Sequence, residues 1–195
     1  MVARKIKLVC GVGVNDADYE VTRYEKGKQV WTCPYYRVWR NALTRAYDEK
    51  YKKKYPTYQS VTVCEEWHSF MRFRAWMETQ DWEGKHLDKD ILAPGNKVYN
   101  PYTCVFVDAL VNTFLTDRFS DRGEWPLGVH WHKRLSKFMS QCSNPFTKKP
   151  EHLGYFHCPN QAHLAWKARK HELACQLADI QVDKRVAEAL RTRYK

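Results

Sequence analysis

The sequence lacks the cysteine spacing that organises a small metal-bound or disulfide-bound domain. It contains seven cysteines, an odd number, and no two of them form a C-x-x-C pair. A zinc ribbon needs such pairs, and a compact disulfide framework needs an even set. We therefore expect no zinc site. Most of the cysteines are expected to be buried small hydrophobic residues in a reducing compartment.

Long apolar runs are also missing. No segment approaches the roughly 20 apolar residues that cross a bilayer, and the N-terminus has no apolar core of a secretory signal. We expect a soluble, cytoplasmic protein with no membrane partner. The 8 Trp, 12 Tyr and 8 Phe predict a folded chain, because disordered chains are poor in aromatic residues. No internal repeat is visible.

Positive charge is abundant. The chain has 33 Lys and Arg against 22 Asp and Glu, a formal net charge of +11, and most of the histidines lie in the C-terminal part. Such a balance favours a polyanionic partner, because cations that neutralise phosphates release condensed counterions. A basic surface that only aids solubility is the alternative.

Two aromatic helices are expected in the N-terminal part, after short strands on either side of a turn near 25–28. The helical spacing of aromatic residues predicts helices over 34–51 and 64–78, and such stripes form a core more often than a binding site. The opposite face of the first helix is basic, with Arg37, Arg40 and Arg45. This face is either a set of phosphate contacts or simply solvated.

Residues 84–115 predict a strand, a loop, a second strand and a short helix. The first strand leads into Asp88-Lys89-Asp90, a Pro-Gly turn carries Asn96, and the helix carries Asn112. This order and these residues resemble the ββα core of the phage HNH (His-Me finger) homing endonucleases. The resemblance implies an Mg²⁺ or Mn²⁺ ion held by Asp88 and Asn112, which Asp90 could share.

The resemblance departs from the family at the base. Lys89 stands where the family has the histidine that activates water, and Asn96 corresponds to the asparagine that orients this base. A lysine is a cation at neutral pH unless strongly desolvated, so Lys89 is expected to bind the scissile phosphate. His86 lies on the same strand face as Asp88 and is the alternative base. A solvated turn capped by Asn96 is the non-catalytic alternative.

The C-terminal part predicts three strands, over 127–133, 137–142 and 151–156, followed by a helix from 160 towards 177. This pattern resembles the DNA-binding domain of plant ethylene-response factors, in which the sheet lies in the major groove. His130, His132, His152 and His157 lie here and could suggest a metal cluster, yet without cysteine pairs we expect no zinc. The candidate DNA contacts of the whole chain are His130, His132, Arg134, Lys137, Gln141, Lys148, Lys149, Arg37 and Arg40.

The sequence thus predicts an α+β protein. It has a helical N-terminal scaffold with a small β-hairpin, a ββα-metal-like core, and a C-terminal three-stranded sheet packed on one helix. We expect residues 1–115 to hold the scaffold and core (about 84–115), 116–126 to be a linker, 127–178 the DNA-binding domain, and 179–195 a charged tail. The expected partner is double-stranded DNA.

Three functions stay open. The first is a divalent-metal-dependent DNA endonuclease or nickase of a phage-infected or bacterial cell, with Lys89, His86 and Asn96 as catalytic residues. The second is a nuclease-inactive DNA-binding protein with the same fold. The third is an interaction protein that binds an acidic host factor.

Overall fold

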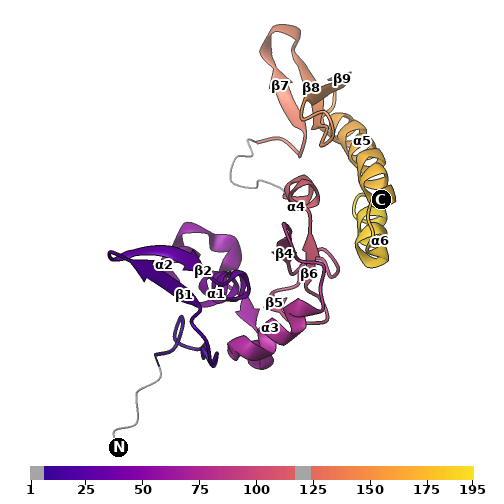
Figure 1. Cartoon of the computed structure of the whole chain (residues 1–195). Helices are drawn as coiled ribbons and strands as arrows, with labels where there is room; N and C mark the ends of the chain where they lie inside the picture. The colour runs from indigo at the N-terminus through magenta and orange to yellow at the C-terminus, as the bar shows by residue number, and fades with distance from the viewer. Residues whose placement is uncertain (1–6, 117–123) are drawn as a thin grey trace, which may run out of the picture. The chain divides into compact units, whose positions relative to one another are not determined.

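The computed structural model describes residues 7–116 and 124–195 (Figure 1). Helices and several small sheets alternate along the chain, so the α+β class is confirmed. The chain divides into two compact units, Met1–Val107 (unit 1) and Asp108–Lys195 (unit 2), and each is described by itself. In the described part, no helix is long and apolar enough to cross a membrane.

The first expected helix is two helices. Helix α1 (Pro34–Tyr47) begins with a proline, whose fixed φ suits the first turn. Asp48 then adopts an extended conformation, and its side chain accepts a hydrogen bond of 2.7 Å from the Tyr51 amide, which caps α2 (Glu49–Lys54). A good N-cap inside the expected helix therefore divides it.

The second expected helix is also divided. A 3₁₀ turn, η2 (Glu65–His68), precedes α3 (Phe70–Glu78). Ser69 stands between them and accepts a hydrogen bond from the Arg72 amide at 3.2 Å. Asp16 strengthens this helix start, because its carboxylate accepts from the Ser69 hydroxyl at 2.6 Å and from the Met71 amide at 2.9 Å.

The aromatic stripes of these helices form the core of unit 1. Trp39, Trp67, Phe70 and Phe73 are fully buried. The Trp39 indole donates a hydrogen bond of 2.7 Å to the Trp67 carbonyl, which satisfies its polar atom inside the core. These helices therefore act as a scaffold.

Three pairs of short strands complete unit 1. Strands β1 (Thr22–Glu25) and β2 (Lys28–Thr32) form an antiparallel hairpin whose side chains are mostly exposed. Strands β3 (Thr62–Val63) and β5 (Val98–Tyr99) pair in parallel. Strands β4 (His86–Asp88) and β6 (Val105–Val107) pair antiparallel, and Asp88 lies opposite Val105. A 3₁₀ turn, η1 (Pro56–Tyr58), precedes β3.

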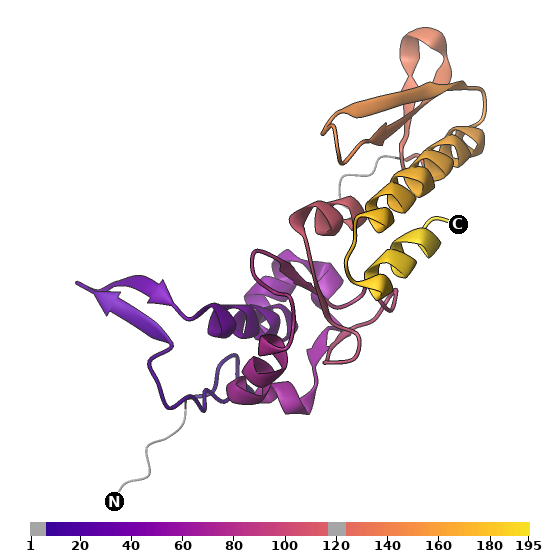
Figure 2. The ribbon, with the colours of Figure 1, turned by 45° about the vertical axis from the view of Figure 1, so that its right-hand side comes forward.

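Unit 2 is built on a sheet and three helices. Strands β7 (Val129–His132), β8 (Lys137–Ser143) and β9 (Pro150–Phe156) form an antiparallel sheet in that order. Helix α5 (Pro159–Asp179) lies along one face of the sheet (Figure 2). The Ser140 hydroxyl on this face donates a hydrogen bond of 2.7 Å to the Ala162 carbonyl of the helix.

An ion pair and a close contact also join the sheet to α5. The Arg169 guanidinium donates to the Glu151 carboxylate at 2.7 Å and 3.2 Å, and this holds the pKa of Glu151 at about 2. Gly128, just before β7, lies against the Trp166 ring: a Cβ atom at this position would be 2.0 Å from the ring. Its φ of +74° also favours glycine.

The ends of unit 2 differ from the sequence prediction. Helix α4 (Ala109–Leu115), expected with the N-terminal part, belongs to unit 2, because the Phe114 carbonyl accepts a hydrogen bond of 2.7 Å from Lys170. The expected charged tail contains α6 (Lys184–Thr192), an amphipathic helix that buries Val186 and Leu190. Within the expected linker 116–126, residues 117–123 lie outside the described part.

All seven cysteines are free thiols. Cys33, Cys104 and Cys142 are buried, whereas the other four are only partly buried. The expectation that most are buried is therefore wrong by a small margin; of the four partly buried ones, Cys10 and Cys64 pack against the core of unit 1.

Candidate functional site

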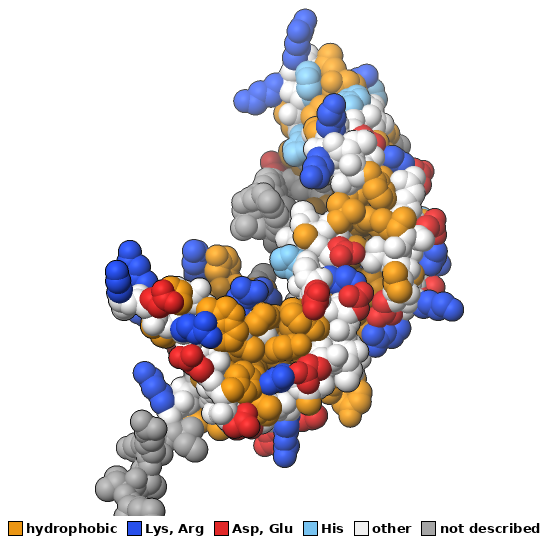
Figure 3. All heavy atoms as spheres, viewed as in Figure 1, with side chains coloured by type: hydrophobic (Ala, Val, Ile, Leu, Met, Phe, Trp, Pro, Cys, Tyr) orange, Lys and Arg blue, Asp and Glu red, His pale blue; other side chains and the backbone are white. Residues whose placement is uncertain are grey.

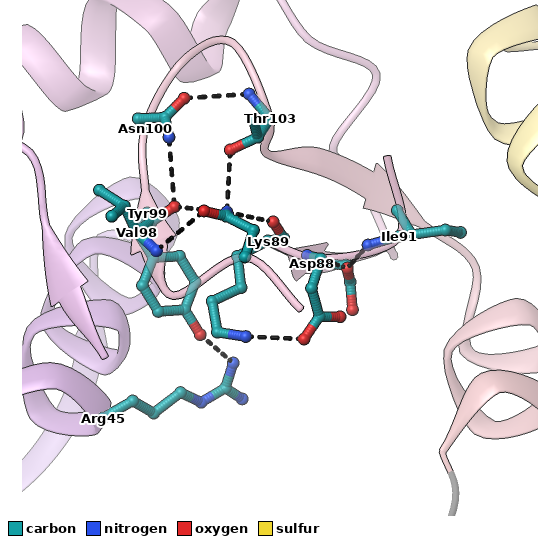
Figure 4. Close-up of polar contacts among 10 residues, drawn as sticks. Arg45, Asp88, Lys89, Ile91, Val98, Tyr99, Asn100 and Thr103 are labelled. Carbon is teal, nitrogen blue, oxygen red and sulfur yellow. Dashed lines mark hydrogen bonds and ion pairs between the residues drawn. The ribbon is translucent and has the colours of Figure 1, made fainter. Parts of the chain in front are cut away.

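Asp88 ends strand β4 and turns its carboxylate onto its own loop. One carboxylate oxygen accepts hydrogen bonds from the backbone amides of Asp90, at 2.8 Å, and Ile91, at 2.7 Å (Figure 4). Burial raises the pKa of Asp88, and the negative charge of Asp90 raises it further, against the lowering effect of the two amides. The side chain therefore shapes the loop that follows the strand.

Lys89, at the position where the predicted resemblance would place a histidine, is buried. Its side chain is 10% exposed, and its ammonium donates to the Asp90 carboxylate at 2.7 Å. The Asp90 side chain is 42% exposed. The lysine charge is thus balanced by its neighbour within the loop.

Asn96 ties the ends of this loop together. Its amide nitrogen lies within hydrogen-bond distance of the Lys89 carbonyl (2.6 Å), the Val98 carbonyl (2.8 Å) and the Thr103 hydroxyl (3.0 Å). Its amide oxygen accepts from the Val98 backbone at 3.1 Å. Asn96 therefore holds the backbone of residue 89 in place, although it makes no contact with the Lys89 ammonium.

The other two residues of the predicted nuclease site lie outside this loop. His86 is exposed on β4, opposite Val107, and shares a strand face with Asp88. Asn112 lies on α4 and belongs to unit 2, whereas Asp88 belongs to unit 1. The structure thus brings Asp88, Lys89 and Asn96 together with Asp90 in one loop.

A metal ion at this loop would have to use few protein ligands. Among residues 7–116 and 124–195, no three His, Cys, Asp or Glu side chains are grouped so that they could hold a metal ion. Mg²⁺ often uses one or two carboxylates and keeps several waters. Asp88 and Asp90 fit that donor set, but the Lys89 ammonium competes for one Asp90 oxygen.

The structure adds an arginine that the sequence placed only on a basic helix face. Arg45 of α1 donates a hydrogen bond of 3.3 Å to the Tyr99 hydroxyl of β5, and its guanidinium lies 6.0 Å from the Tyr58 ring centre. Tyr58 is close enough to Asp90 and Asp88 that their charges raise its pKa, in addition to the larger effect of burial. No sequence pattern marked these tyrosines as partners of Arg45, because they come from separate segments.

The outer face of the C-terminal sheet carries the second candidate site. In the strand register, His130 lies opposite Met139, and His132 opposite Lys137, on the face that α5 does not cover. On the third strand Tyr155 is 41% exposed, and its ring lies 5.2 Å from His132. The outward side chains on this face are His130, His132, Lys137, Met139, Gln141, His152 and Tyr155.

Basic residues surround this face at the strand ends. Arg134, one of the predicted DNA contacts, lies in the 3₁₀ turn η3 (Lys133–Leu135), because β7 ends at His132. The His132 ring accepts a hydrogen bond of 3.3 Å from the Leu135 amide and caps this turn. Lys148 and Lys149 are exposed in the loop between β8 and β9.

We call the outward residues together with Lys133, Arg134, Lys148 and Lys149 the sheet surface. Histidine and cationic side chains gather at the sheet end of unit 2 in the space-filling view (Figure 3). The other two predicted DNA contacts, Arg37 and Arg40, lie on α1 in unit 1, where Arg37 is exposed and Arg40 is partly buried.

Comparisons with known proteins give no family. No family model matches the chain, and neither a curated protein nor a solved structure matches it.

Proposed function

We propose that this protein binds double-stranded DNA through the sheet surface of unit 2. The observation that carries the proposal is the contrast between the two faces of the sheet. One face is covered by α5, whereas the other is open and carries cationic, amide, imidazole and aromatic side chains. This surface is also where the resemblance to the ethylene-response-factor domain would place DNA. The location we propose for the protein is the cytoplasm.

The side chains suit two kinds of contact. Arg134, Lys137, Lys148 and Lys149 are donors for phosphate oxygens, which supply affinity without sequence information. Gln141 is half-buried in the middle of the open face, and its amide has both a donor and an acceptor for a base edge in the major groove. The charged residues therefore position the duplex, and Gln141 contributes to base selection.

The test is a salt titration of binding to a duplex oligonucleotide, followed by fluorescence anisotropy. The double variant Lys148→Ala/Lys149→Ala removes two exposed charges from the sheet surface. We expect weaker binding and a slope of log affinity against log salt that is smaller by about 1.8, because each phosphate contact contributes about 0.9. The control Lys184→Ala/Lys195→Ala removes the same charge from exposed positions near the C-terminus of unit 2.

If both double variants lost the same amount of DNA affinity, net charge alone would explain the loss, and a specific binding surface would be contradicted. Binding that does not respond to salt would contradict phosphate contacts altogether.

A second candidate function is metal-dependent cleavage of DNA by a ββα-metal-like core. The observation that favours it is the loop after β4, where Asp88 and Asp90 lie together and Asn96 holds the backbone of Lys89. When bound, Mg²⁺ or Mn²⁺ would supply a Lewis acid, held by Asp88 and Asp90. In this function Lys89 binds the scissile phosphate and His86, exposed on the same strand, accepts a proton from water.

Plasmid nicking with Mg²⁺ or Mn²⁺ tests this candidate. We expect Asp90→Asn to abolish nicking and Asp81→Asn, which removes an exposed carboxylate of unit 1, to leave it intact. Nicking that persists in Asp90→Asn would contradict the site. An inert wild type whose Lys89→His variant nicks DNA would identify a disarmed nuclease, and the binding function would then stand alone.

A further inference from the structure

We propose that Arg45 is the centre of an anion site in unit 1 that binds a backbone phosphate of a nucleic acid strand, apart from the sheet surface. The proposal rests on the proposed function for the class of ligand, DNA, but it concerns other residues and another unit. Four segments build the site: α1 supplies Arg45, α2 and η1 supply tyrosines, and β5 supplies Tyr99.

The Arg45 guanidinium has unused donors. It carries five N–H groups, and within the described part of the chain its single hydrogen bond goes to the Tyr99 hydroxyl. No carboxylate among the described residues forms an ion pair with it. The arginine stays charged although burial opposes the charged form, because a guanidinium keeps its proton throughout the working pH range.

A partly desolvated cation without a carboxylate is unfavourable by itself, and an anion would offset that free energy. Planar guanidinium groups bind phosphate oxygens through two parallel hydrogen bonds. The acidic group to consider is Asp90, whose charge adds to the larger effect of burial in raising the pKa of Tyr58. Its charge is balanced by the Lys89 ammonium at 2.7 Å, so it does not neutralise Arg45 (Figure 4).

The tyrosines and lysines beside Arg45 indicate that the ligand is a nucleic acid strand. Tyr51 packs against Tyr55, at 4.6 Å between ring centres, and against Tyr58, at 5.5 Å. Tyr55 is 40% exposed, and the Lys54 ammonium lies 5.3 Å from its ring centre, so an exposed aromatic residue and a cation lie side by side. Tyrosine rings stack on bases of any sequence, and neighbouring cations attract the backbone. The last turn of α2 supplies those cations as Lys52, Lys53 and Lys54.

The test uses the full chain and compares Arg45→Gln with Arg72→Gln, which removes an exposed arginine from α3 in the same unit. Affinity for a DNA oligonucleotide is measured by anisotropy over a salt series. We expect Arg45→Gln to weaken binding on the order of tenfold and to reduce the salt slope by about 0.9, the value for one phosphate. Arg72→Gln is expected to bind like the wild type.

A second arm separates two sources of phosphate. The melting temperature is measured in inorganic phosphate and in chloride at equal ionic strength. A rise in phosphate that Arg45→Gln lacks would show that phosphate alone fills the site. No rise, together with the loss of DNA affinity, would show that the site needs a strand, and both results support the phosphate chemistry.

The proposal is overturned if Arg45→Gln keeps the wild-type near-ultraviolet circular dichroism and also the wild-type affinity and salt slope. If Arg45→Gln does not fold, photocrosslinking of the wild type to an iodouridine-substituted strand decides: crosslinks in residues 45–58 support the site, and crosslinks confined to unit 2 overturn it. Failure of the proposed DNA-binding function of the sheet surface can be told apart from failure of the Arg45 site. In that case Lys148→Ala/Lys149→Ala would bind DNA normally, whereas Arg45→Gln would not.

Discussion

The two candidate regions use their polar residues in opposite ways. In the loop after β4, the side chains of Asp88 and Asn96 each make two or more hydrogen bonds to the loop itself. On the sheet surface, the side chains of Lys137 and Gln141 make no hydrogen bond within the described part of the chain. The first set builds the fold, whereas the second set remains available to a partner.

This difference separates two meanings of a polar motif. A residue whose hydrogen bonds are complete within its own loop is explained by stability, and a further chemical role needs evidence of its own. A surface polar residue without protein partners is hydrogen-bonded to water, and a ligand can replace that water without breaking a bond of the fold. Substitutions should therefore affect folding in the first region and binding in the second.

The largest expected effect is on the stability of unit 2, through the contact between Gly128 and the Trp166 ring of α5. We expect Gly128→Ala to destabilise unit 2 by about 3 kcal/mol or more, because the methyl group overlaps the Trp166 ring and the left-handed backbone disfavours alanine. Hydrogen exchange followed by mass spectrometry checks this, with loss of protection in β7 and α5. Gly84→Ala is the control, since it has a φ of +72° with open space around it. Equal losses in the two variants would attribute the effect to φ alone.

The next effect concerns the loop. We expect Asn96→Ala to lower the free energy of unfolding by about 2–4 kcal/mol, because it removes the partners of several partly buried backbone and hydroxyl groups. Urea denaturation measures the change. Asn41→Ala, at an exposed position of α1, is expected to stay within about 0.5 kcal/mol of the wild type. If Asn96→Ala changed the free energy of unfolding only slightly, a structural role would be contradicted, and Asn96 would be assigned to binding or catalysis.

A smaller effect is expected from Asp88→Asn, and its sign depends on pH. Because the folded pKa of Asp88 is raised from 3.8, ionisation of this carboxyl lowers stability as the pH rises through that pKa. Asparagine keeps the accepting oxygen and does not ionise. The melting temperature of Asp88→Asn relative to the wild type should therefore increase from pH 3 to pH 7. A relative decrease over this range would contradict the burial of Asp88.

The smallest effect is expected for the ion pair behind the sheet. The pKa of Glu151 is lowered from 4.5 to about 2, so its stabilising effect is complete above pH 4.5 and disappears as the pH falls towards 2. Thermal melts should show Glu151→Gln less stable than the wild type at pH 7 and equal to it near pH 2. Glu172→Gln, which removes the other carboxylate that pairs with Arg169, is the control. We expect its stability difference from the wild type to depend less on pH. A difference independent of pH would indicate lost packing instead.

Much of the local structure follows from the sequence. The predicted strands near 127–133, 137–142 and 151–156 correspond to β7, β8 and β9, and the predicted helix from 160 corresponds to α5. Alternation and helical spacing determine such elements, because they reflect which face is buried. The breaks at Asp48 and Ser69 were missed, since each is set by a side-chain cap inside an otherwise helical pattern.

The contacts that the polar side chains make were harder to predict from the sequence. The order Asp88, Lys89, Asp90 and Asn96 indicated a loop, but whether the side chains face inward depends on contacts such as that between Asn96 and Thr103. Arg45 looked equivalent to Arg37 and Arg40 on one helix face. Only its pairing with Tyr99, more than fifty residues later, distinguishes it.

The hairpin of β1 and β2 has a consequence for self-association. Among the described residues each strand pairs only with the other, so within that part of the chain both outer edges are open for pairing with a strand of another molecule. Val30 and Trp31 are exposed there and would favour such pairing. A register irregularity between Arg23 and Tyr24 and the cations Lys26 and Lys28 oppose it, because bulges twist an edge and like charges repel. We therefore expect Lys26 and Lys28 to act against aggregation through this edge.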